Sequence, residues 1–391
     1  MKERPRPDSD PSCAALGLYV HIPFCVRKCH YCDFNSGPAD SEIRNRYLEA
    51  LLNEIRNSPW RGYRATSLFL GGGTPSELAP VELEKLLETV GSSFRLEDDA
   101  ECTIECNPGT VDQPYFHRMR RAGLNRISLG VQTFDDTKLR LLGRIHDSTQ
   151  ARQACADARR AGFTNVSMDL IFSLPGQTLK EWEDDLEQAL RMEPDHLSLY
   201  HLTLEPGTNF WRWQYSLEMP DEETGAAMYE HAIERCEETG FEQYEISNFA
   251  RPGFRSRHNS MYWRNEPFLG FGVSAASFYG GVRWSNTANW SRYIEGSQAG
   301  TIPLSSCEVL PGAQALAEEI MLRLRTREGF SLSLLSKRYQ EDVESLFKEP
   351  IQLLTHHGLL VREHDSIRLT RRGLLLANEV CGEFLRAAPS R

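Results

Sequence analysis

The sequence has no long apolar run and no excess of positive charge. Its longest apolar stretch, residues 14–26, is interrupted by His21 and Pro23, and a membrane-spanning helix needs about 20 apolar residues. The formal net charge is −11, which argues against broad electrostatic affinity for nucleic acid or anionic membranes. The charged, proline-rich N-terminus lacks the apolar core of a secretory signal. We therefore expect a cytoplasmic protein with no transmembrane segment and no nucleic-acid partner.

Cysteine is also scarce. Ten cysteines in 391 residues are too few for a disulfide scaffold. In a reducing compartment, clustered cysteines more often bind a metal or react than form disulfides. Hydrophobic residues make up 40% and charged residues 25% of the chain, which is ordinary globular usage. The length predicts two or three domains with a sizeable core.

Short β-rich runs alternate with segments of helical period from residue 17 to about 200, and this alternation predicts βαβ units with a parallel sheet. Gly123, Gly162 and Gly240 each follow a helical segment and are expected to end it in the left-handed conformation. A looser strand is expected at 244–246. The strands are expected at 17–22, 66–70, 102–106, 126–130, 165–170 and 196–200, and helices at 42–56, 81–90, 151–161 and 179–191.

The composition changes twice towards the C-terminus. Residues 241–310 are rich in aromatic residues, Asn, Ser and Gly, and we expect short strands and loops packed on the preceding sheet. Helices at 313–325, 332–339 and 343–357, followed by a hairpin at 359–362 and 366–369, predict a winged-helix-like module. The predicted divisions are a flexible tail (1–15), the main α/β domain (16–240), an extension (241–310) and a C-terminal domain (311–391).

The clearest functional motif consists of Cys25, Cys29 and Cys32, directly after the first predicted strand. Thiolates at these spacings can surround one soft metal centre, either zinc or an iron–sulfur cluster. A closed structural zinc site needs four ligands, but Phe34 stands where the nearest fourth would be, and His30 is crowded by its neighbours. Three thiolates therefore leave one coordination position open.

Polar residues follow several of the predicted strands. A glycine-rich turn, residues 71–75, follows the second strand, and its glycines allow a close approach of the backbone to a ligand. Glu105, Gln132 and Asp169 lie at or near the ends of the next three strands. Because the carboxyl ends of parallel strands meet at one mouth of a barrel, we expect these residues to lie together near the cysteines.

The cysteine motif, with Tyr31 before its last cysteine, resembles the signature of the radical S-adenosylmethionine (SAM) superfamily. The flanking residues 19–24 and 33–35 resemble the HemN/HemW group, which contains oxygen-independent coproporphyrinogen III oxidase and haem chaperones. The resemblance implies an open (β/α)6 barrel of partial TIM type. It also implies a [4Fe–4S] cluster on Cys25, Cys29 and Cys32, whose fourth iron binds SAM and whose electron produces a 5′-deoxyadenosyl radical.

The same resemblance implies which residues contact SAM. The glycine turn would bind the methionine amino group, a carboxylate would accept from the ribose hydroxyls, and Arg144 would pair with the methionine carboxylate. Whether SAM is consumed is left open. The implied contact residues are Tyr19, Tyr31, Gly72, Gly73, Thr74, Glu105, Gln132, Arg144 and Asp169.

Two features separate the members of this group. The oxidase has a further cysteine two residues after the third, where this chain has Phe34, and a longer N-terminal segment. Residues 258–263 match the H-N-x-x-Y-W motif of the haem-chaperone branch. His258 is expected to bind haem iron, because imidazole is a natural axial ligand, and Tyr262 and Trp263 to pack on the macrocycle. The resemblance thus implies transfer of haem to acceptor proteins, with respiratory proteins as one candidate class.

Two other functions are kept as alternatives. The first is oxidative decarboxylation of porphyrinogen propionates by the deoxyadenosyl radical, the reaction of the oxidase. The second is modification of a nucleic acid, with the C-terminal module as reader. For the latter the sequence offers a local basic cluster near the expected hairpin, consisting of Arg362, Arg368, Arg371 and Arg372.

Overall fold

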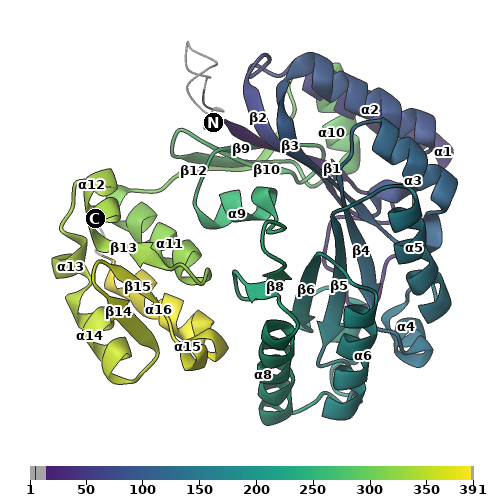
Figure 1. Ribbon diagram of the computed structural model, residues 1–391. Coiled ribbons are helices and arrows are strands. Elements are labelled where there is room, and N and C mark those ends of the chain that lie inside the picture. The colour runs from purple at the N-terminus through teal and green to yellow at the C-terminus, as the bar shows by residue number, and fades with distance from the viewer. Residues whose placement is uncertain (1–4, 6–14, 389–391) are drawn as a thin grey trace.

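The computed structural model describes residue 5 and residues 15–388 (Figure 1). Most of the tail predicted for residues 1–15, including Cys13, lies outside these residues. None of the described helices has the length and apolar character needed to cross a membrane.

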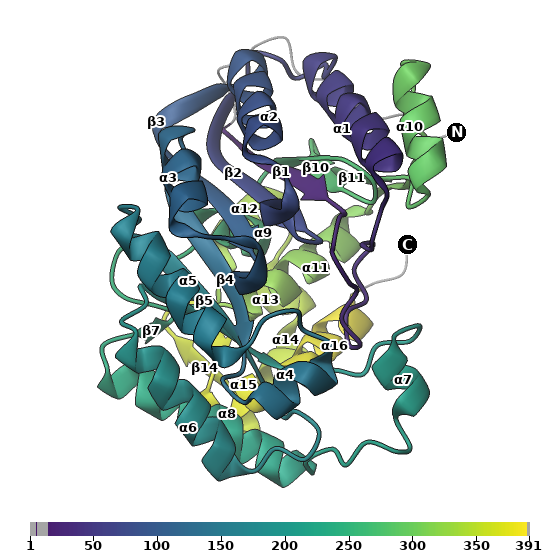
Figure 2. The same ribbon diagram turned by 90° about the vertical axis from the view of Figure 1, so that its right-hand side faces the viewer.

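A parallel sheet forms the centre of the molecule. Neighbouring strands pair in chain order and in parallel from β1 to β6, and the helices between them cover one face of the sheet (Figure 2). This is the predicted open (β/α)6 barrel. The strands are β1 (Leu16–Ile22), β2 (Arg64–Gly72), β3 (Arg95–Cys106), β4 (Arg126–Gln132), β5 (Val166–Phe172) and β6 (His196–His201), and the helices are α1 (Ser41–Arg56), α2 (Pro80–Ser93), α3 (Gln113–Arg121), α4 (Asp136–Leu142), α5 (Ser148–Arg160) and α6 (Leu179–Arg191).

Alternation along the strands separates an apolar outer face from a polar inner face. In β4, Ile127, Leu129 and Val131 belong to the hydrophobic core under the helices, whereas Ser128 and Gly130 line an inner cavity. Successive side chains of a strand point to opposite faces, so this pattern places every second residue inside the barrel. The inner face of the barrel therefore carries polar side chains that could contact a ligand.

Residues 241–310 contain the short strands that the composition predicted, but these strands extend the sheet at both edges instead of packing on it. In the described part of the chain, twelve strands form one sheet. β9 pairs in parallel with β1 and is followed by antiparallel strands, while β8 and β7 are added antiparallel beyond β6. The added strands are β7 (Glu242–Gln243), β8 (Asn248–Ala250), β9 (Phe268–Phe271), β10 (Ala276–Tyr279), β11 (Val282–Asn286) and β12 (Leu304–Val309).

Two details of this region differ from the prediction. The segment also contains helices, α9 (Arg257–Trp263) and α10 (Trp290–Gln298). Gly240 is left-handed, with φ of 83°, as are Gly123 and Gly162, but residues 244–246 after it do not form a strand. Their backbone instead joins the C-terminal domain, where the Ile246 N–H donates to the Arg325 carbonyl at 3.1 Å.

The C-terminal domain contains the predicted hairpin and helices, except that the helix expected at 343–357 is divided into α13 and α14, and two helices that were not predicted, α15 and α16, follow the hairpin. α11 packs close to α9, which lies between the barrel strands and this domain (Figure 1). α8 (Glu222–Glu238) connects to the domain through an Arg371–Glu234 ion pair at 3.3 Å. The other elements of the domain are α11 (Gly312–Leu324), β13 (Phe330–Ser331), α12 (Leu332–Tyr339), α13 (Val343–Leu346), α14 (Lys348–His356), β14 (Leu360–Glu363), β15 (Ser366–Leu369), α15 (Arg371–Leu375) and α16 (Ala377–Ala387).

Candidate functional site

The cysteine loop after β1 is held in place by backbone hydrogen bonds. The Cys25 N–H donates to the Gly37 carbonyl at 3.0 Å, which closes the loop on itself. The His30 N–H donates to the Leu142 carbonyl at 2.9 Å, and Nδ1 of the same ring lies 2.9 Å from the Leu141 carbonyl. Because a carbonyl oxygen only accepts, His30 serves to attach the loop to α4.

The three thiols line one cavity of about 410 Å³ at the carboxyl ends of the strands. Thr74 Oγ1 lies 3.5 Å from Cys25 Sγ, and Arg144 Nη1 lies 3.5 Å from Cys29 Sγ. Burial is the main reason that the pKa values of Cys25 and Cys32 are raised, and the neighbouring Cys29 adds to both shifts. A metal centre bound between the thiols would favour their thiolate form and so lower the pKa values of Cys25 and Cys32, because the thiolate is the form that binds metals.

The glycine turn packs directly against the cysteine loop. A Cβ on Gly73 would lie 2.6 Å from the Phe24 carbonyl oxygen, and Gly72 has a left-handed φ of 113°. The Gly73 N–H donates to the Ile22 carbonyl at 2.8 Å and the Thr74 N–H to the Phe24 carbonyl at 2.7 Å. These N–H groups are therefore used inside the protein, and glycine is required here by the close approach of two backbones.

Two carboxylates lie on the cavity wall. Glu105 accepts the Gly72 N–H at 3.1 Å, and Asp169 accepts from Ser128 Oγ at 3.0 Å. Burial, followed by the negative charge of Asp169, raises the pKa of Glu105 to about 7. Burial also raises the pKa of Asp169. Both groups are acceptors suited to a pair of hydroxyls.

Gln132 and Arg144 complete this wall. β4 has an irregularity between Gly130 and Gln132, and Gln132 itself is left-handed, with φ of 71°. Arg144 Nη2 donates to the Gly130 carbonyl at 2.6 Å, while the buried Nε has no hydrogen-bond partner among the described residues. Arg144 therefore has a spare N–H for an acceptor of the ligand, such as a carboxylate.

The three motif residues that were expected around haem do not line one cavity. His258 is 1% exposed, and its ring stacks on Phe69 with centroids 5.2 Å apart. Its Nδ1 lies 2.8 Å from Ser67 Oγ and its Nε2 lies 2.7 Å from Tyr262 Oη. Burial lowers the pKa of His258 to about 3. Tyr262 lines a second cavity, whereas Trp263 lies in a different cleft against the C-terminal domain.

This second cavity, of about 660 Å³, adjoins the cysteine cavity. The two cavities share Phe34, Gly72 and Glu105 in their walls. Tyr19 lines the second cavity, and its hydroxyl lies 2.9 Å from Nδ1 of His21. The wall is mainly apolar and aromatic; its other members include Tyr262, Phe268, Phe278, Met321 and Leu322.

Apart from Tyr19, which lines the second cavity, the structure brings together the other sequence-predicted site residues. Tyr31, Gly72, Gly73, Thr74, Glu105, Gln132, Arg144 and Asp169 line the cysteine cavity with the three thiols. The sequence interpretation missed Ser128, Asn107, Tyr200 and His201, which also line it. Tyr200 and His201 lie at the carboxyl end of β6, where the same argument that identified Gln132 and Asp169 would have predicted them. Ser128 lies on the inner face of β4, which the alternation of that strand would have indicated.

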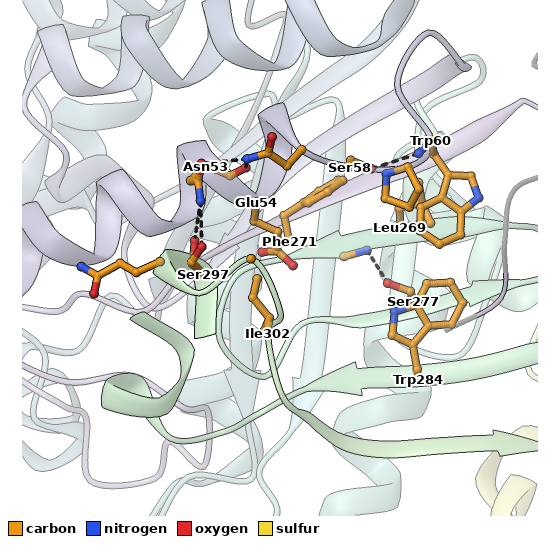
Figure 3. A pocket seen from close by; sticks show the side chains of 15 residues that line it. Asn53, Glu54, Ser58, Trp60, Leu269, Phe271, Ser277, Trp284, Ser297 and Ile302 are labelled. Carbon is orange, nitrogen blue, oxygen red and sulfur yellow. Dashed lines mark hydrogen bonds between the residues drawn. The ribbon is translucent and has the colours of Figure 1, made fainter. Parts of the chain in front are cut away.

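A third cavity, of about 460 Å³, lies between α1 and strands β9–β11 (Figure 3). Trp60 and Trp284 stack beside it with ring centroids 5.5 Å apart. Asn53 Nδ2 donates to the Ser297 carbonyl at 2.8 Å. This polar group has its hydrogen-bond partner inside the protein. We therefore interpret this cavity as a gap in the packing of α1 on the sheet.

The residues of the cysteine cavity fit an iron–sulfur cluster better than a single ion. Among the described residues, no three His, Cys, Asp or Glu side chains converge where one metal ion could sit. A cuboidal cluster binds each thiolate through a different iron atom, so its ligands stand around it. Three thiols on one cavity, with Arg144 next to Cys29, match this arrangement.

Family models match two parts of the chain. The model of the Radical SAM superfamily matches residues 19–189. The model of the HemN C-terminal domain matches residues 310–376.

Curated relatives match nearly the whole chain. The heme chaperone HemW of Escherichia coli is 42% identical over 378 residues, covering 95% of this chain and 98% of the relative. Heme chaperone HemW of Bacillus subtilis is 37% identical over 372 residues, covering 94% and 98%. Among solved structures, the coproporphyrinogen III oxidase HemN of E. coli superposes with a TM-score of 0.85 at 26% identity, covering 96% of this chain and 91% of HemN.

Proposed function

This chain belongs to the HemN/HemW group of the radical SAM superfamily, and from this membership we propose that it is a haem chaperone that binds haem and transfers it to acceptor proteins. The similarity to heme chaperone HemW, 42% identity over 95% of this chain in one relative, is the observation that carries the proposal. Phe34, at the position of the oxidase's additional cysteine, supports the same choice.

Membership in the superfamily implies a [4Fe–4S] cluster and SAM. We propose that Cys25, Cys29 and Cys32 hold the cluster. When bound, the cluster supplies the electron for reductive cleavage of a C–S bond of SAM. Arg144, with its unpartnered Nε, would pair with the methionine carboxylate.

The other residues of this cavity would orient the cofactor. Glu105 and Asp169 would accept hydrogen bonds from the ribose hydroxyls, because both present carboxylate oxygens to the cavity. Gln132 offers an amide on the same wall. Tyr31 is adjacent to the cluster ligand Cys32 and packs near Phe210, with ring centroids 6.4 Å apart.

The apolar second cavity is suited to a flat macrocycle. Its volume of about 660 Å³ falls in the range of about 300–1,000 Å³ that is typical of small-molecule sites. Aromatic rings such as Phe268 and Phe278 line it, and rings of this type can stack on a tetrapyrrole. The shared wall would place the haem next to the cofactor.

Haem titration tests this function directly. Protein purified and reconstituted without oxygen should show a saturable Soret shift on addition of haemin. It should then pass the haem to excess apomyoglobin, a generic acceptor, with a measurable rate. A triple Cys→Ser variant at positions 25, 29 and 32 separates haem uptake from the cluster. The absence of a Soret shift in the wild-type protein would refute the chaperone function.

Coproporphyrinogen oxidation is the second candidate, favoured by the superposition with HemN at a TM-score of 0.85. The reconstituted protein can be supplied with coproporphyrinogen III, SAM and a reductant. We expect no protoporphyrinogen above that formed by a cluster-free control. Robust formation of protoporphyrinogen would establish the oxidase function in place of the chaperone function.

A nucleic-acid function receives no support from the basic cluster of the C-terminal domain. Arg362 pairs with Glu344 at 2.6 Å, and Arg368 pairs with Glu363 at 2.5 Å. Paired arginines offer little attraction for phosphates. We also propose a cytoplasmic location, because a cluster of thiols that binds a metal centre is typical of a reducing compartment.

A further inference from the structure

If the protein binds haem as proposed above, the iron needs a ligand from the protein. Four side chains of the apolar cavity are of a type that can bind haem iron. They are Tyr19, His21, Tyr262 and Met321. His258, the expected imidazole ligand, is not on the cavity wall. Its ring is 1% exposed and both of its nitrogens have partners. Haem iron could bind Nε2 only after Tyr262 had been displaced, or Nδ1 only after Ser67 had been displaced.

The hydrogen bond between Tyr19 and His21 occupies the atoms with which these two residues would bind iron. His21 Nε2 lies 3.1 Å from the Asn35 carbonyl oxygen, which only accepts, so Nε2 must carry the ring proton. Nδ1 is then an acceptor, and it takes the hydrogen bond of the Tyr19 hydroxyl at 2.9 Å. A Tyr19 phenolate would face the lone pair of this nitrogen. Tyr19 is therefore held as a neutral phenol.

The corresponding pair in α9 has no such restriction. His258 Nε2 faces Tyr262 Oη at 2.7 Å, and Nδ1 faces Ser67 Oγ at 2.8 Å. A serine hydroxyl can donate or accept, so either nitrogen of His258 can carry the ring proton. With the proton on Nε2, His258 donates to a Tyr262 phenolate, while Ser67 donates to Nδ1. Burial and the negative charge of Glu105 raise the pKa of the Tyr262 phenol, so the phenolate requires both the hydrogen bond from His258 and a cation at its oxygen, such as ferric iron.

The chemistry of the iron favours the same residue. A phenolate is a known axial ligand of haem, and as a hard anion it suits ferric iron better than the soft thioether of Met321 does. The Tyr262 ring is held by an edge contact with Phe268, with centroids 4.5 Å apart, so its oxygen has a defined position. α9 lies between the barrel strands and the C-terminal domain (Figure 1), and both contribute to the cavity wall, for example through Tyr19 of β1 and Met321 of α11.

We propose that Tyr262 is the axial ligand of ferric haem and that His258 is a positioning residue that donates a hydrogen bond to the ligating oxygen. One Fe–O bond forms and the Tyr262 O–H bond breaks. The proton leaves to solvent, as metal binding to an ionisable ligand requires. The iron stays ferric, and the His258 ring stays neutral because its single proton occupies Nε2.

Resonance Raman spectroscopy of the haemin complex tests this assignment. The wild-type complex should show tyrosinate vibrations and a phenolate-to-iron charge-transfer band. Tyr262→Phe should lose both and release haem to apomyoglobin at least tenfold faster. Tyr19→Phe, which removes a phenol from the same cavity, is the matched control and should keep both signals. His258→Gln should keep the tyrosinate vibrations at shifted frequencies.

Each contrary result has a distinct meaning. Haem binding by the wild-type protein without tyrosinate vibrations, or unchanged spectra in Tyr262→Phe, would overturn the Tyr262 assignment and leave the chaperone function standing. Loss of the tyrosinate signal in Tyr19→Phe alone would transfer the ligand role to Tyr19. Failure of the wild-type protein to bind haemin would refute the chaperone function and, with it, the ligand assignment.

Discussion

The side chain of Glu105 accepts a hydrogen bond from the backbone N–H of Gly72, with 3.1 Å between Oε2 and the nitrogen. This bond joins the end of β3 to the glycine turn after β2. Both residues belong to the wall between the cysteine cavity and the apolar cavity. One carboxylate thus connects the backbone of the cofactor site to the region proposed for haem.

The stability of the metal-free protein should depend on the protonation of Glu105. Its pKa rises from 4.5 to about 7 on folding, so between these values the native state holds a proton that the unfolded chain has lost. The stability from this group is full below about pH 4.5 and is lost as the pH rises through 7. Glu105→Gln should remove this loss and be more stable than wild type at pH 8, by up to about 3 kcal/mol. Urea unfolding at pH 5 and 8 measures it; a less stable variant at pH 8 would contradict the prediction.

Replacing Gly73 by Ala should disrupt the cofactor site. The new Cβ would lie 2.6 Å from the Phe24 carbonyl oxygen, so either the turn or the cysteine loop must move. We expect at least a tenfold weaker SAM affinity by calorimetry. Gly91→Ala is the matched control, because a Cβ on this residue of α2 meets nothing within 4 Å, and it should change stability by no more than about 1 kcal/mol, in the favourable direction. Equal SAM affinities in the two variants would argue against the close-approach explanation.

Single replacements of Cys25, Cys29 or Cys32 by Ala should abolish the iron–sulfur absorbance after anaerobic reconstitution and leave the circular dichroism spectrum largely unchanged. The reason is that all three thiols line one cavity, and loss of any one removes a ligand of the same cluster. Cys307→Ser on β12, remote in sequence from this loop, is expected to reconstitute like wild type. A full complement of inorganic sulfide in all three alanine variants would rule out these ligands.

Arg126 should control the ionisation of Glu105 and Asp169, the two carboxylates that we propose bind SAM. This arginine is 2% exposed, its Nε has no hydrogen-bond partner in the described residues, and its charge lowers the pKa of both Glu105 and Asp169. Arg126→Met should therefore raise both pKa values and move the pH dependence of SAM binding upwards, with up to about tenfold weaker binding at pH 7. Arg126→Lys keeps the charge and should bind like wild type. Superimposable pH profiles for the methionine variant and wild type would disprove this role.

Much of the architecture could be predicted from local patterns. The bounds of α6, residues 179–191, were predicted from helical period alone, and the parallel sheet followed from the alternation of strands and helices. The convergence of Gln132 and Asp169 on the cysteine cavity followed from their positions at or near the ends of parallel strands. Helix α9 was not predicted, because its aromatic residues lack a clear apolar period, and its position depends on contacts such as that between His258 and Ser67, 191 residues apart.

The sequence by itself determined the cysteine spacing, the alternation of strands and helices, and the polar residues that end several strands, because these depend on neighbours along the chain. Only the tertiary structure decided that Tyr262 faces the apolar cavity while His258 lies behind it and Trp263 faces elsewhere. The seven residues of α9 turn successive side chains about 100° apart. Which of these directions meets the cavity depends on how the helix is packed between β2 and the C-terminal domain, and no local pattern records that packing.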